Sequence, residues 1–324
     1  MGRRERLARR HHAASGTTQR LLRRRPAGGE RTGAAARAED AFLDALDALG
    51  RQKALDAVVA PVQRVVRALP LGGARDVLHG LPLGHPLHPV LVQVPIGAWM
   101  SASVLDAVPG TRRSARFLVG LGVLAAAPAA VAGWVDWAEQ HEDQMRTGLV
   151  HALSTASAVG LYAASWVQRG RGRVALGKAL GWAGLCVAGA GGLLGGHLAF
   201  RQAAGPNKTE PVPHLLEPDW LPLGSMAEFP AGEAVRRMLG EVPVLVVRET
   251  GGLIHVLADR CSHLSGPLSE GTVADGCVEC PWHGSVFRLA DGKNVRGPAT
   301  APQPAFEVRV DSTGTVHVRL PGAG

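Results

Sequence analysis

Residues 260–268 read RCSHLSGPL, and residues 280–287 read CPWHGSVF. Each stretch pairs one cysteine with one histidine, and 16 residues separate the pairs, which are Cys261-x-His263 and Cys280-x2-His283. Thiolates and imidazoles are the ligands of zinc sites and of iron–sulfur clusters. Structural zinc sites more often place two cysteines in one knuckle, whereas here each stretch supplies one ligand of each kind. The pattern predicts a metal centre that is shared by two loops.

The segments around these stretches are short and rich in valine, which is typical of β-strands. PVLVVRE (243–249) and LIHVLAD (253–259) are joined by TGG and predict a hairpin. SVFRLADGKNV (285–295) and FEVRVDSTGTVHVRL (306–320) predict two more hairpins. Residues 219–321 are therefore expected to form a small all-β antiparallel domain that carries the two Cys/His stretches in its loops.

The two stretches resemble the ligand loops of Rieske [2Fe–2S] domains. The resemblance rests on CSHLSGPL at 261–268, CPWHGSVF at 280–287 and the proline-bearing third loop RGPAT at 296–300, and it covers nearly all of 219–321. It implies that one iron of the cluster takes two thiolates and the other takes two imidazoles. The implied ligands are Cys261 and Cys280 for the inner iron, and His263 and His283 for the outer iron.

The resemblance also implies a function in electron transfer. Neutral imidazoles in place of two thiolates raise the reduction potential of Rieske clusters to about −150 to +300 mV. Trp282 and Ser285 in the second loop and Pro298 in the third stand where the family's residues surround the cluster. Ser285 is expected to donate a hydrogen bond toward the cluster and so to tune it.

Two positions depart from the Rieske subunits of respiratory bc complexes, which carry an extra cysteine in each ligand loop. Here these positions hold Gly266 and Trp282. The remaining cysteines, Cys186 and Cys277, have no cysteine partner in the first loop. The domain is therefore expected to be similar to the Rieske ferredoxins that serve oxygenases and related reductases.

The rest of the chain has the composition of a membrane protein. Hydrophobic residues make up 46% and charged residues 19%, and there are 42 glycines, which suits closely packed membrane helices. Much of the net charge of +8 lies between Arg3 and Arg37, so residues 1–39 are expected to be a disordered basic arm at an anionic membrane surface, with no nucleic acid as partner. Residues 40–80 have apolar positions at spacings of three and four and predict amphipathic helices.

An all-α transmembrane bundle of four helices is predicted for residues 81–202, followed by a polar linker at 203–218. Each apolar stretch is near the roughly 20 residues that cross a bilayer as a helix. The predicted spans are 89–108, 117–135, 149–167 and 176–200. This segment is similar to an uncharacterised bacterial membrane family, on the basis of GHPLHP at 84–89, GWVDW at 133–137 and GGHLAF at 195–200. The resemblance implies no reaction.

Four histidines are predicted to lie at one end of this bundle, which we call the histidine face. Consecutive antiparallel spans bring together His85, His88, His151 and His197, with Asp136 beside them and Asp106 at the opposite end. A histidine near hydrocarbon either has its ring nitrogens hydrogen-bonded or takes part in function. Three roles stay open: haem b ligation, a quinone or proton site, and interhelical hydrogen bonding.

Two arguments on membrane orientation oppose each other. The loops opposite the histidine face are rich in arginine, which puts them in the cytoplasm and both termini outside. Against this, an arginine-dense tail without an apolar signal segment and a cluster-bearing domain would both have to be exported. The working expectation is a bacterial inner-membrane protein with its Rieske domain in the cytoplasm.

The sequence predicts a carrier of single electrons rather than a stand-alone catalyst. No dinucleotide-binding or ATP-binding motif occurs, and no domain with two histidines and a carboxylate for iron follows the last predicted strand. The expected partners are membrane lipid and a redox protein, either a reductase or an oxygenase or oxidase, with a haem or quinone in the bundle as a second station. The alternative is a redox-responsive sensor or interaction module.

Overall fold

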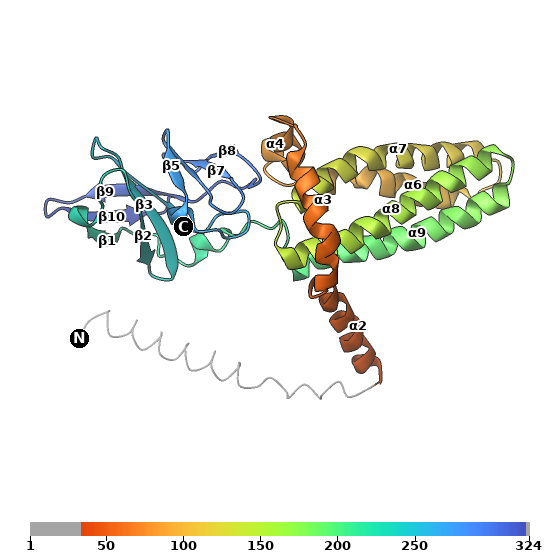
Figure 1. Cartoon of the computed structure of the whole chain (residues 1–324), viewed down its shortest axis with the longest axis horizontal. Coiled ribbons are helices and arrows are strands. Elements are labelled where there is room, and N and C mark those ends of the chain that lie inside the picture. Colours follow the sequence, from red (N-terminus) through yellow and green to blue (C-terminus); the bar gives the residue numbers. More distant parts are fainter. Residues whose placement is uncertain (1–33, 322–324) are drawn as a thin grey trace, which may run out of the picture. The chain divides into compact units, whose positions relative to one another are not determined.

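The computed structural model describes residues 34–321 (Figure 1). Contacts divide the chain into two units, Met1–Ala48 and Leu49–Gly324. The described part of the first unit belongs to α2 (Ala34–Gly50), which carries an apolar stripe along its length. Residues 1–33, which include most of the predicted basic arm, lie outside the described residues.

The second unit begins with short helices that join the bundle at its histidine face. These are η1 (Lys53–Leu55), α3 (Asp56–Ala68), α4 (Ala74–His79) and η2 (Leu81–Leu83). Val59 and Val66, two turns apart on α3, are buried in a cluster with Trp137 and Met145. Arg146 donates to the Asp56 carboxylate at 2.6 Å. These contacts fix α3 against the ends of α7 and α8.

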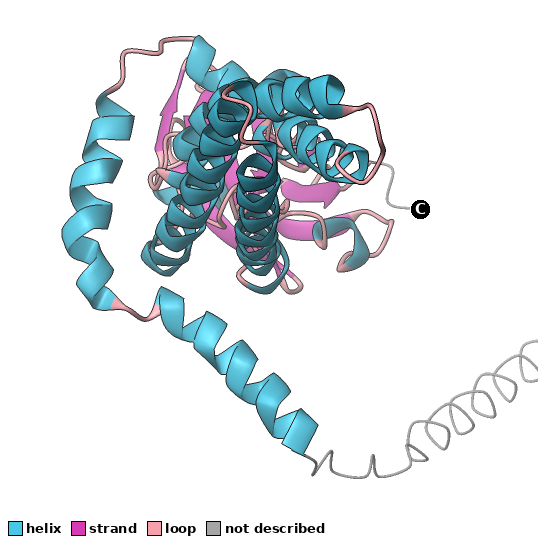
Figure 2. Cartoon of the chain, turned by 90° about the vertical axis from the view of Figure 1, so that its right-hand side faces the viewer, coloured by secondary structure: helices cyan, strands magenta, loops and turns pink. Residues whose placement is uncertain are grey.

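The bundle consists of long antiparallel helices that lie side by side (Figures 1 and 2). They are α6 (Gln93–Leu105), which the short helix α5 (His88–Leu91) precedes, α7 (Arg112–Trp137), α8 (Glu142–Gly170) and α9 (Val174–Gly196), which continues into the π-helical turn η3 (His197–Arg201). Glycines make room for the aromatic core. A Cβ on Gly122 would lie 2.2 Å from Nε1 of Trp99, whose indole stacks on Tyr162 at a centroid distance of 4.1 Å.

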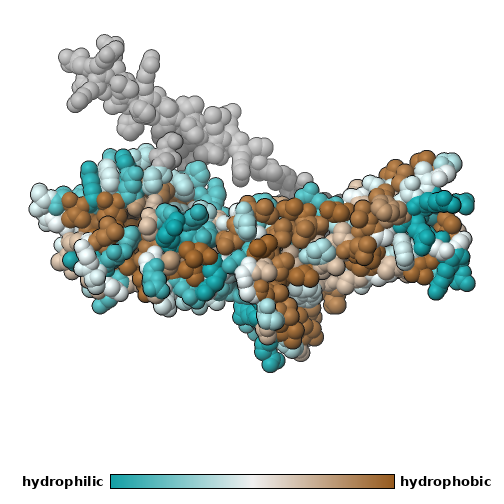
Figure 3. Space-filling model, turned by 90° about the horizontal axis from the view of Figure 1, so that it is seen from above, coloured by the Kyte–Doolittle hydropathy of each residue, from teal (hydrophilic) through white to brown (hydrophobic). Residues whose placement is uncertain are grey.

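Three of the four predicted spans are long and apolar enough to cross a membrane. They are His88–Leu105, Arg112–Trp137 and Val174–Arg201. Large apolar side chains such as Val104, Phe117 and Leu124 are exposed on this bundle, and Figure 3 shows the hydrophobic surface that covers its helices. The remaining predicted span, 149–167, lies in α8, whose histidine, serine and threonine side chains make it more polar than the others.

The end of the bundle opposite the histidine face contains a buried ion pair. Arg169 donates to both carboxylate oxygens of Asp106, each at 2.6 Å, and the side chains are 4% and 6% exposed. Gly177 and Gly181 leave the space for the guanidinium, because a Cβ on Gly177 would lie 2.5 Å from Cγ of Arg169. The Arg169–Asp106 pair therefore ties α8 to the end of α6.

The C-terminal part is all-β, as the sequence predicts. A six-stranded sheet has the order β1-β10-β9-β4-β3-β2 and a four-stranded sheet has the order β5-β6-β7-β8. The predicted hairpins β3–β4, β7–β8 and β9–β10 are confirmed as antiparallel pairs. The strands are β1 (Leu221–Ser225), β2 (Ala234–Leu239), β3 (Val242–Arg248), β4 (Ile254–Ala258), β5 (Thr272–Ala274), β6 (Cys277–Glu279), β7 (Val286–Arg288), β8 (Asn294–Arg296), β9 (Ala305–Val310) and β10 (Thr315–Arg319).

The strand ends position the loops that carry the chemistry. The first Cys/His loop runs from β4 to β5, and the second joins β6 to β7. Buried Gln303 holds the first loop: its Nε2 donates to the carbonyls of Ala258 and Arg260, and its Oε1 accepts the Ser262 N–H at 3.2 Å. These bonds satisfy the buried amide of Gln303 and hold the backbone of the first loop in place.

Candidate iron–sulfur site

The two Cys/His loops have the same backbone arrangement. In the first loop the Cys261 N–H donates to the Gly266 carbonyl at 2.8 Å, and in the second the Cys280 N–H donates to the Ser285 carbonyl at 2.8 Å. A second bond closes each loop by returning to the cysteine carbonyl, from Ser265 in one and Gly284 in the other. Both cysteine side chains are 2% exposed. Two matching turns therefore present two buried thiols to one point.

The two thiols lie in contact, and their pKa values are shifted in opposite directions. The hydrogen bond with Cys280, with burial, raises the pKa of Cys261. The bond from Cys261 lowers the pKa of Cys280 to about 7, and the backbone N–H groups of Trp282 and His283 act in the same direction. Backbone N–H groups of His263 and Leu264 point at the other sulfur. Donors aimed at both sulfurs favour thiolates, the form in which cysteine binds metal.

The two histidines face each other beside the thiols. The His263 and His283 ring centroids lie 5.0 Å apart with planes at 89°. Two imidazoles on one tetrahedral metal, with metal–nitrogen bonds of about 2.0 Å, have centroids about 5 Å apart. The Nδ1 of His263 is buried and has no hydrogen-bond partner in the described protein. An orphaned buried nitrogen at this spacing fits a histidine pair that shares one iron.

Both imidazoles are neutral at pH 7, as metal ligands must be. Burial lowers the pKa of His263 to about 3, and the nearby imidazoles of His283 and His79 disfavour a proton on it in the same direction. Burial, with the nearby Arg67, lowers the pKa of His283 to about 4. The site thus combines one thiol of raised pKa and one of lowered pKa with two neutral imidazoles.

The ligand set fits a two-iron cluster better than a single ion. Within residues 34–321, no three side chains of His, Cys, Asp or Glu converge on one point. A structural zinc ion needs four protein ligands around it, whereas each iron of a Rieske centre takes only two and completes its shell with sulfide. The four side chains therefore fit a [2Fe–2S] cluster.

Gly266 and Trp282 lie next to each other in the two loops. A Cβ on Gly266 would be 3.1 Å from the Trp282 indole and 2.8 Å from Sγ of Cys280. Trp282 itself is 48% exposed. All four cysteines are free thiols. The Trp282 indole thus packs against Gly266 where the two loops meet. No disulfide joins the loops at these two positions.

The other predicted residues lie in the second and third loops. Ser285 is fully buried, and its Oγ accepts the Ala299 N–H at 3.0 Å, which leaves its own hydrogen for another acceptor. Pro298 lines a cavity of about 210 Å³ together with His283. The cavity is also lined by His79 of α4 and by Glu139, two residues after the end of α7.

The bundle covers the histidine edge of the β domain through residues that the sequence did not indicate. Asp76 on α4 accepts the Gly297 N–H at 2.8 Å, although 221 positions separate them. The His141 ring, between α7 and α8, lies 5.6 Å from Trp282 and 6.2 Å from His283 by centroid. No motif marks Asp76 or His141, because only the folded chain brings them to the ligand loops.

The four predicted histidines do not form one cluster at the histidine face. His88 and His151 meet with ring centroids 6.3 Å apart. His85 is exposed, and its Nδ1 bonds locally to the Pro86 carbonyl. His197 is buried at the start of η3. Asp136 accepts from His79, 2.8 Å away, a histidine that the sequence interpretation passed over.

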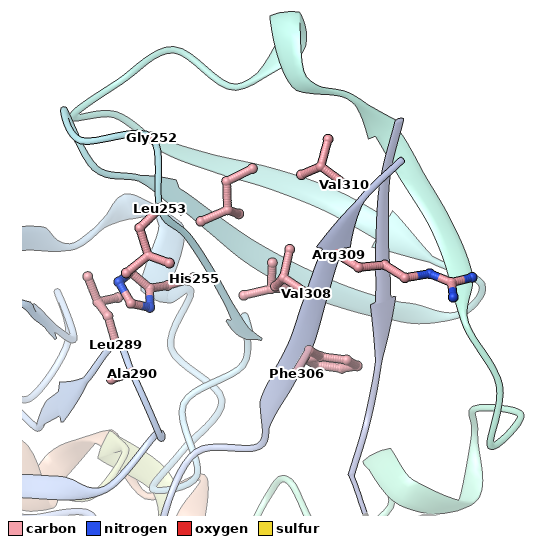
Figure 4. Close-up of a pocket in the computed structure, with 11 residues that line it drawn as sticks. Gly252, Leu253, His255, Leu289, Ala290, Phe306, Val308, Arg309 and Val310 are labelled. Carbon is pink, nitrogen blue, oxygen red and sulfur yellow. The ribbon is translucent and has the colours of Figure 1, made fainter. Parts of the chain in front are cut away.

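A second and larger cavity does not belong to the candidate site. It measures about 380 Å³ and opens where β4 and β9 diverge beyond their short pairing (Figure 4). Its lining is mostly aliphatic, and His255, which borders it, bonds to Glu249 at 2.9 Å. None of the four predicted cluster ligands lines it. The predicted ligand His283 instead lines the smaller cavity.

Comparison with known families assigns both parts of the chain. The Rieske [2Fe-2S] domain matches residues 219–307. The family described as predicted membrane protein (DUF2231) matches residues 84–208. The first match includes all four predicted ligands, and the second covers the bundle and part of the linker.

Curated relatives match the β part over most of their own length. The ferredoxin subunit of anthranilate 1,2-dioxygenase from Burkholderia cepacia is 38% identical over 92 residues, which are 28% of this chain and 84% of the relative. The ferredoxin subunit of 3-phenylpropionate/cinnamic acid dioxygenase from Escherichia coli K12 is 38% identical over 99 residues, which are 30% of this chain and 91% of the relative. A solved complex of reduced oxygenase and oxidized ferredoxin in carbazole 1,9a-dioxygenase contains a chain that is 32% identical, with a TM-score of 0.29, over 32% of this chain and 94% of that one.

Proposed function

Because the chain belongs to the Rieske [2Fe–2S] family through residues 219–307, we propose that it is a membrane-anchored carrier of single electrons. The observation that supports this most is that the same two loops pair the thiols of Cys261 and Cys280 and bring the rings of His263 and His283 to 5.0 Å by centroid, with the Nδ1 of His263 left for a ligand bond. A bound cluster supplies reversible one-electron chemistry. The protein's part is to hold the thiolates buried and the imidazoles neutral at pH 7.

A protein partner supplies and removes the electron in this proposal. The relatives are ferredoxin subunits of dioxygenases, so the partner classes are a reductase and an oxygenase or oxidase. Stopped-flow mixing of the full-length protein with such a reductase and a reduced nicotinamide tests this. We expect bleaching of the cluster's visible absorption within seconds and its return with an electron acceptor. A cluster that neither reaction changes would contradict the carrier function and favour a sensor.

The bundle anchors the carrier and offers it a second redox station. A haem b or a quinone at the histidine face would extend electron transfer from the cluster into the membrane. Support for this part comes from His88 and His151, which meet at the same end of the bundle as the β domain. The apolar surface of α6, α7 and α9 supports lipid as the surroundings.

The location we propose is a bacterial inner membrane, with the β domain on the cytoplasmic side. A green fluorescent protein fused after Gly324 tests the side, because it fluoresces when it folds in the cytoplasm and not after export through the general secretion route. Fluorescent cells whose fusion resists external protease fit the proposal. A dark fusion, with an active alkaline phosphatase at the same position, would reverse the orientation.

Ser285→Ala is expected to lower the reduction potential of the cluster. The hydroxyl accepts from Ala299, so its hydrogen is free to stabilise the additional negative charge of the reduced state. A hydrogen bond to a charged group contributes about 1.5–3 kcal/mol, which corresponds to about 65–130 mV for one electron. A redox titration followed by circular dichroism measures the shift. Ser269→Ala, away from the cysteines, is the control, and an unchanged potential in Ser285→Ala would contradict the assigned role.

A further inference from the structure

His88 and His151 share a hydrogen-bonding pattern that prepares both rings to bind a metal. Nδ1 of His88 lies 2.8 Å from the Ala129 carbonyl of α7, and Nδ1 of His151 lies 2.8 Å from the Gly191 carbonyl of α9. A carbonyl only accepts, so each Nδ1 must carry the proton and each Nε2 the lone pair. Histidines that bind metals are held in this way, with the other ring nitrogen bonded to a carbonyl or carboxylate.

The His88 and His151 rings lie farther apart than the rings of the two predicted cluster histidines. Their centroids lie 6.3 Å apart with planes at 83°. Two imidazoles on opposite sides of one metal, with bonds of about 2.0 Å, have centroids about 6.3 Å apart, against about 5 Å for a tetrahedral pair. The bundle pair therefore has the separation of two axial ligands, whereas His263 and His283 have that of two tetrahedral ligands.

Glycines on two helices hold the rings in place. A Cβ on Gly133 would lie 2.8 Å from Nδ1 of His88, and a Cβ on Gly195 would lie 3.3 Å from Cε1 of His151. Both imidazoles are only half-buried. The bundle thus fixes the rings from the helix side while part of each stays accessible.

We propose that His88 and His151 are the two axial ligands of a haem in the membrane bundle, which names the second station of the proposed function and rests on it. No third His, Cys, Asp or Glu converges with them within the described part of the chain. Two nitrogens are too few for a bare ion, but they suffice for iron that arrives with four equatorial nitrogens of its own. His85 is exposed and is not part of this ring pair, so the proposal does not include it.

A series of neighbouring residues joins this pair to the cluster loops. His283 and His79 line the same cavity, and Nδ1 of His79 lies 2.8 Å from the Asp136 carboxylate. Asp136 is three positions after Gly133, which contacts His88, so both lie on neighbouring turns of α7. The transfer moves one electron from the reduced cluster, which returns to two ferric irons, to ferric haem, which becomes ferrous. No bond breaks and no proton is required.

Spectroscopy of the full-length protein tests the assignment. The protein is made in cells supplied with a haem precursor, purified in detergent, and examined by visible absorption, pyridine haemochrome assay and low-temperature EPR. We expect one haem b per chain and a low-spin ferric signal of the strongly anisotropic kind that perpendicular axial imidazoles give. His88→Ala and His151→Ala should each reduce the Soret absorbance at least tenfold, and added imidazole should restore it.

Controls separate this inference from the proposed function. His85→Ala should keep the haem, and the Rieske signal measured in each variant reports that the chain is still folded. Haem-free protein with a full Rieske signal would overturn the haem site and leave the carrier function standing. Haem that persists in both alanine variants, or that is lost in His85→Ala alone, would overturn the ligand assignment. Haem without any Rieske signal would support the inference and contradict the carrier function.

Discussion

His283→Ala is expected to remove the cluster. The variant deletes one of two imidazoles on the outer iron, and His263 alone, 5.0 Å away by ring centroid, cannot complete the shell. We expect iron content and the visible absorption of the β domain to fall by more than about tenfold, since cluster binding depends on each ligand. Metal analysis and the absorption spectrum of freshly purified protein measure the loss.

A matched histidine in the same domain provides the control for His283→Ala. His255 lies on β4 and bonds to Glu249, away from the thiols, so His255→Ala should retain the iron. The core that contains Val244, Val246 and Val256 does not involve the ligand loops, so the variants should keep their β-sheet circular dichroism. Full iron content in His283→Ala would remove this residue from the ligand set.

Asp106→Ala is expected to cause a large loss of stability in the bundle. The change leaves the Arg169 guanidinium, 4% exposed, buried without its carboxylate. Removing one partner of a buried ion pair costs about 3–5 kcal/mol. Thermal unfolding of the detergent-purified protein measures the effect, with the signal of the cluster as a second probe in the other domain.

Two further variants identify the cause of this loss. Arg169→Lys keeps the charge but loses the paired bonds to both Asp106 oxygens, so an intermediate loss is expected. The double variant Asp106→Leu with Arg169→Met removes both charges and should regain most of the stability, because apolar replacements of a buried pair are often neutral. A double variant as unstable as Asp106→Ala would show that packing, not the unpaired charge, is responsible.

The sequence predicts the cluster site well because its ligands lie in two short local motifs. Cys261 and His263 share one loop, Cys280 and His283 share another, and the valine-rich segments around them form the predicted hairpins. The position of Gly266 against Trp282 also follows from these motifs. Where spacing along the chain determines proximity, the residue pattern is sufficient.

Contacts between distant segments are what the sequence does not predict. Asp76 meets Gly297 across 221 positions, and Arg169 meets Asp106 across 63. Antiparallel spans put four histidines at one end of the bundle, but helical rotation decides that His88 meets His151 and that His85 does not. The sequence does not indicate His79, because this residue stands alone before the GHPLHP motif. Only the fold shows its contact with Asp136.

Low-temperature EPR of the reduced, detergent-purified full-length protein, together with its metal content, tests the central claim most directly. We predict two irons per chain beyond any haem iron and a rhombic signal that appears only after reduction, with an average g value below that of the free electron, as mixed thiolate and imidazole ligation gives. Freshly purified protein that contains zinc in place of iron, or iron without this signal, would contradict the account.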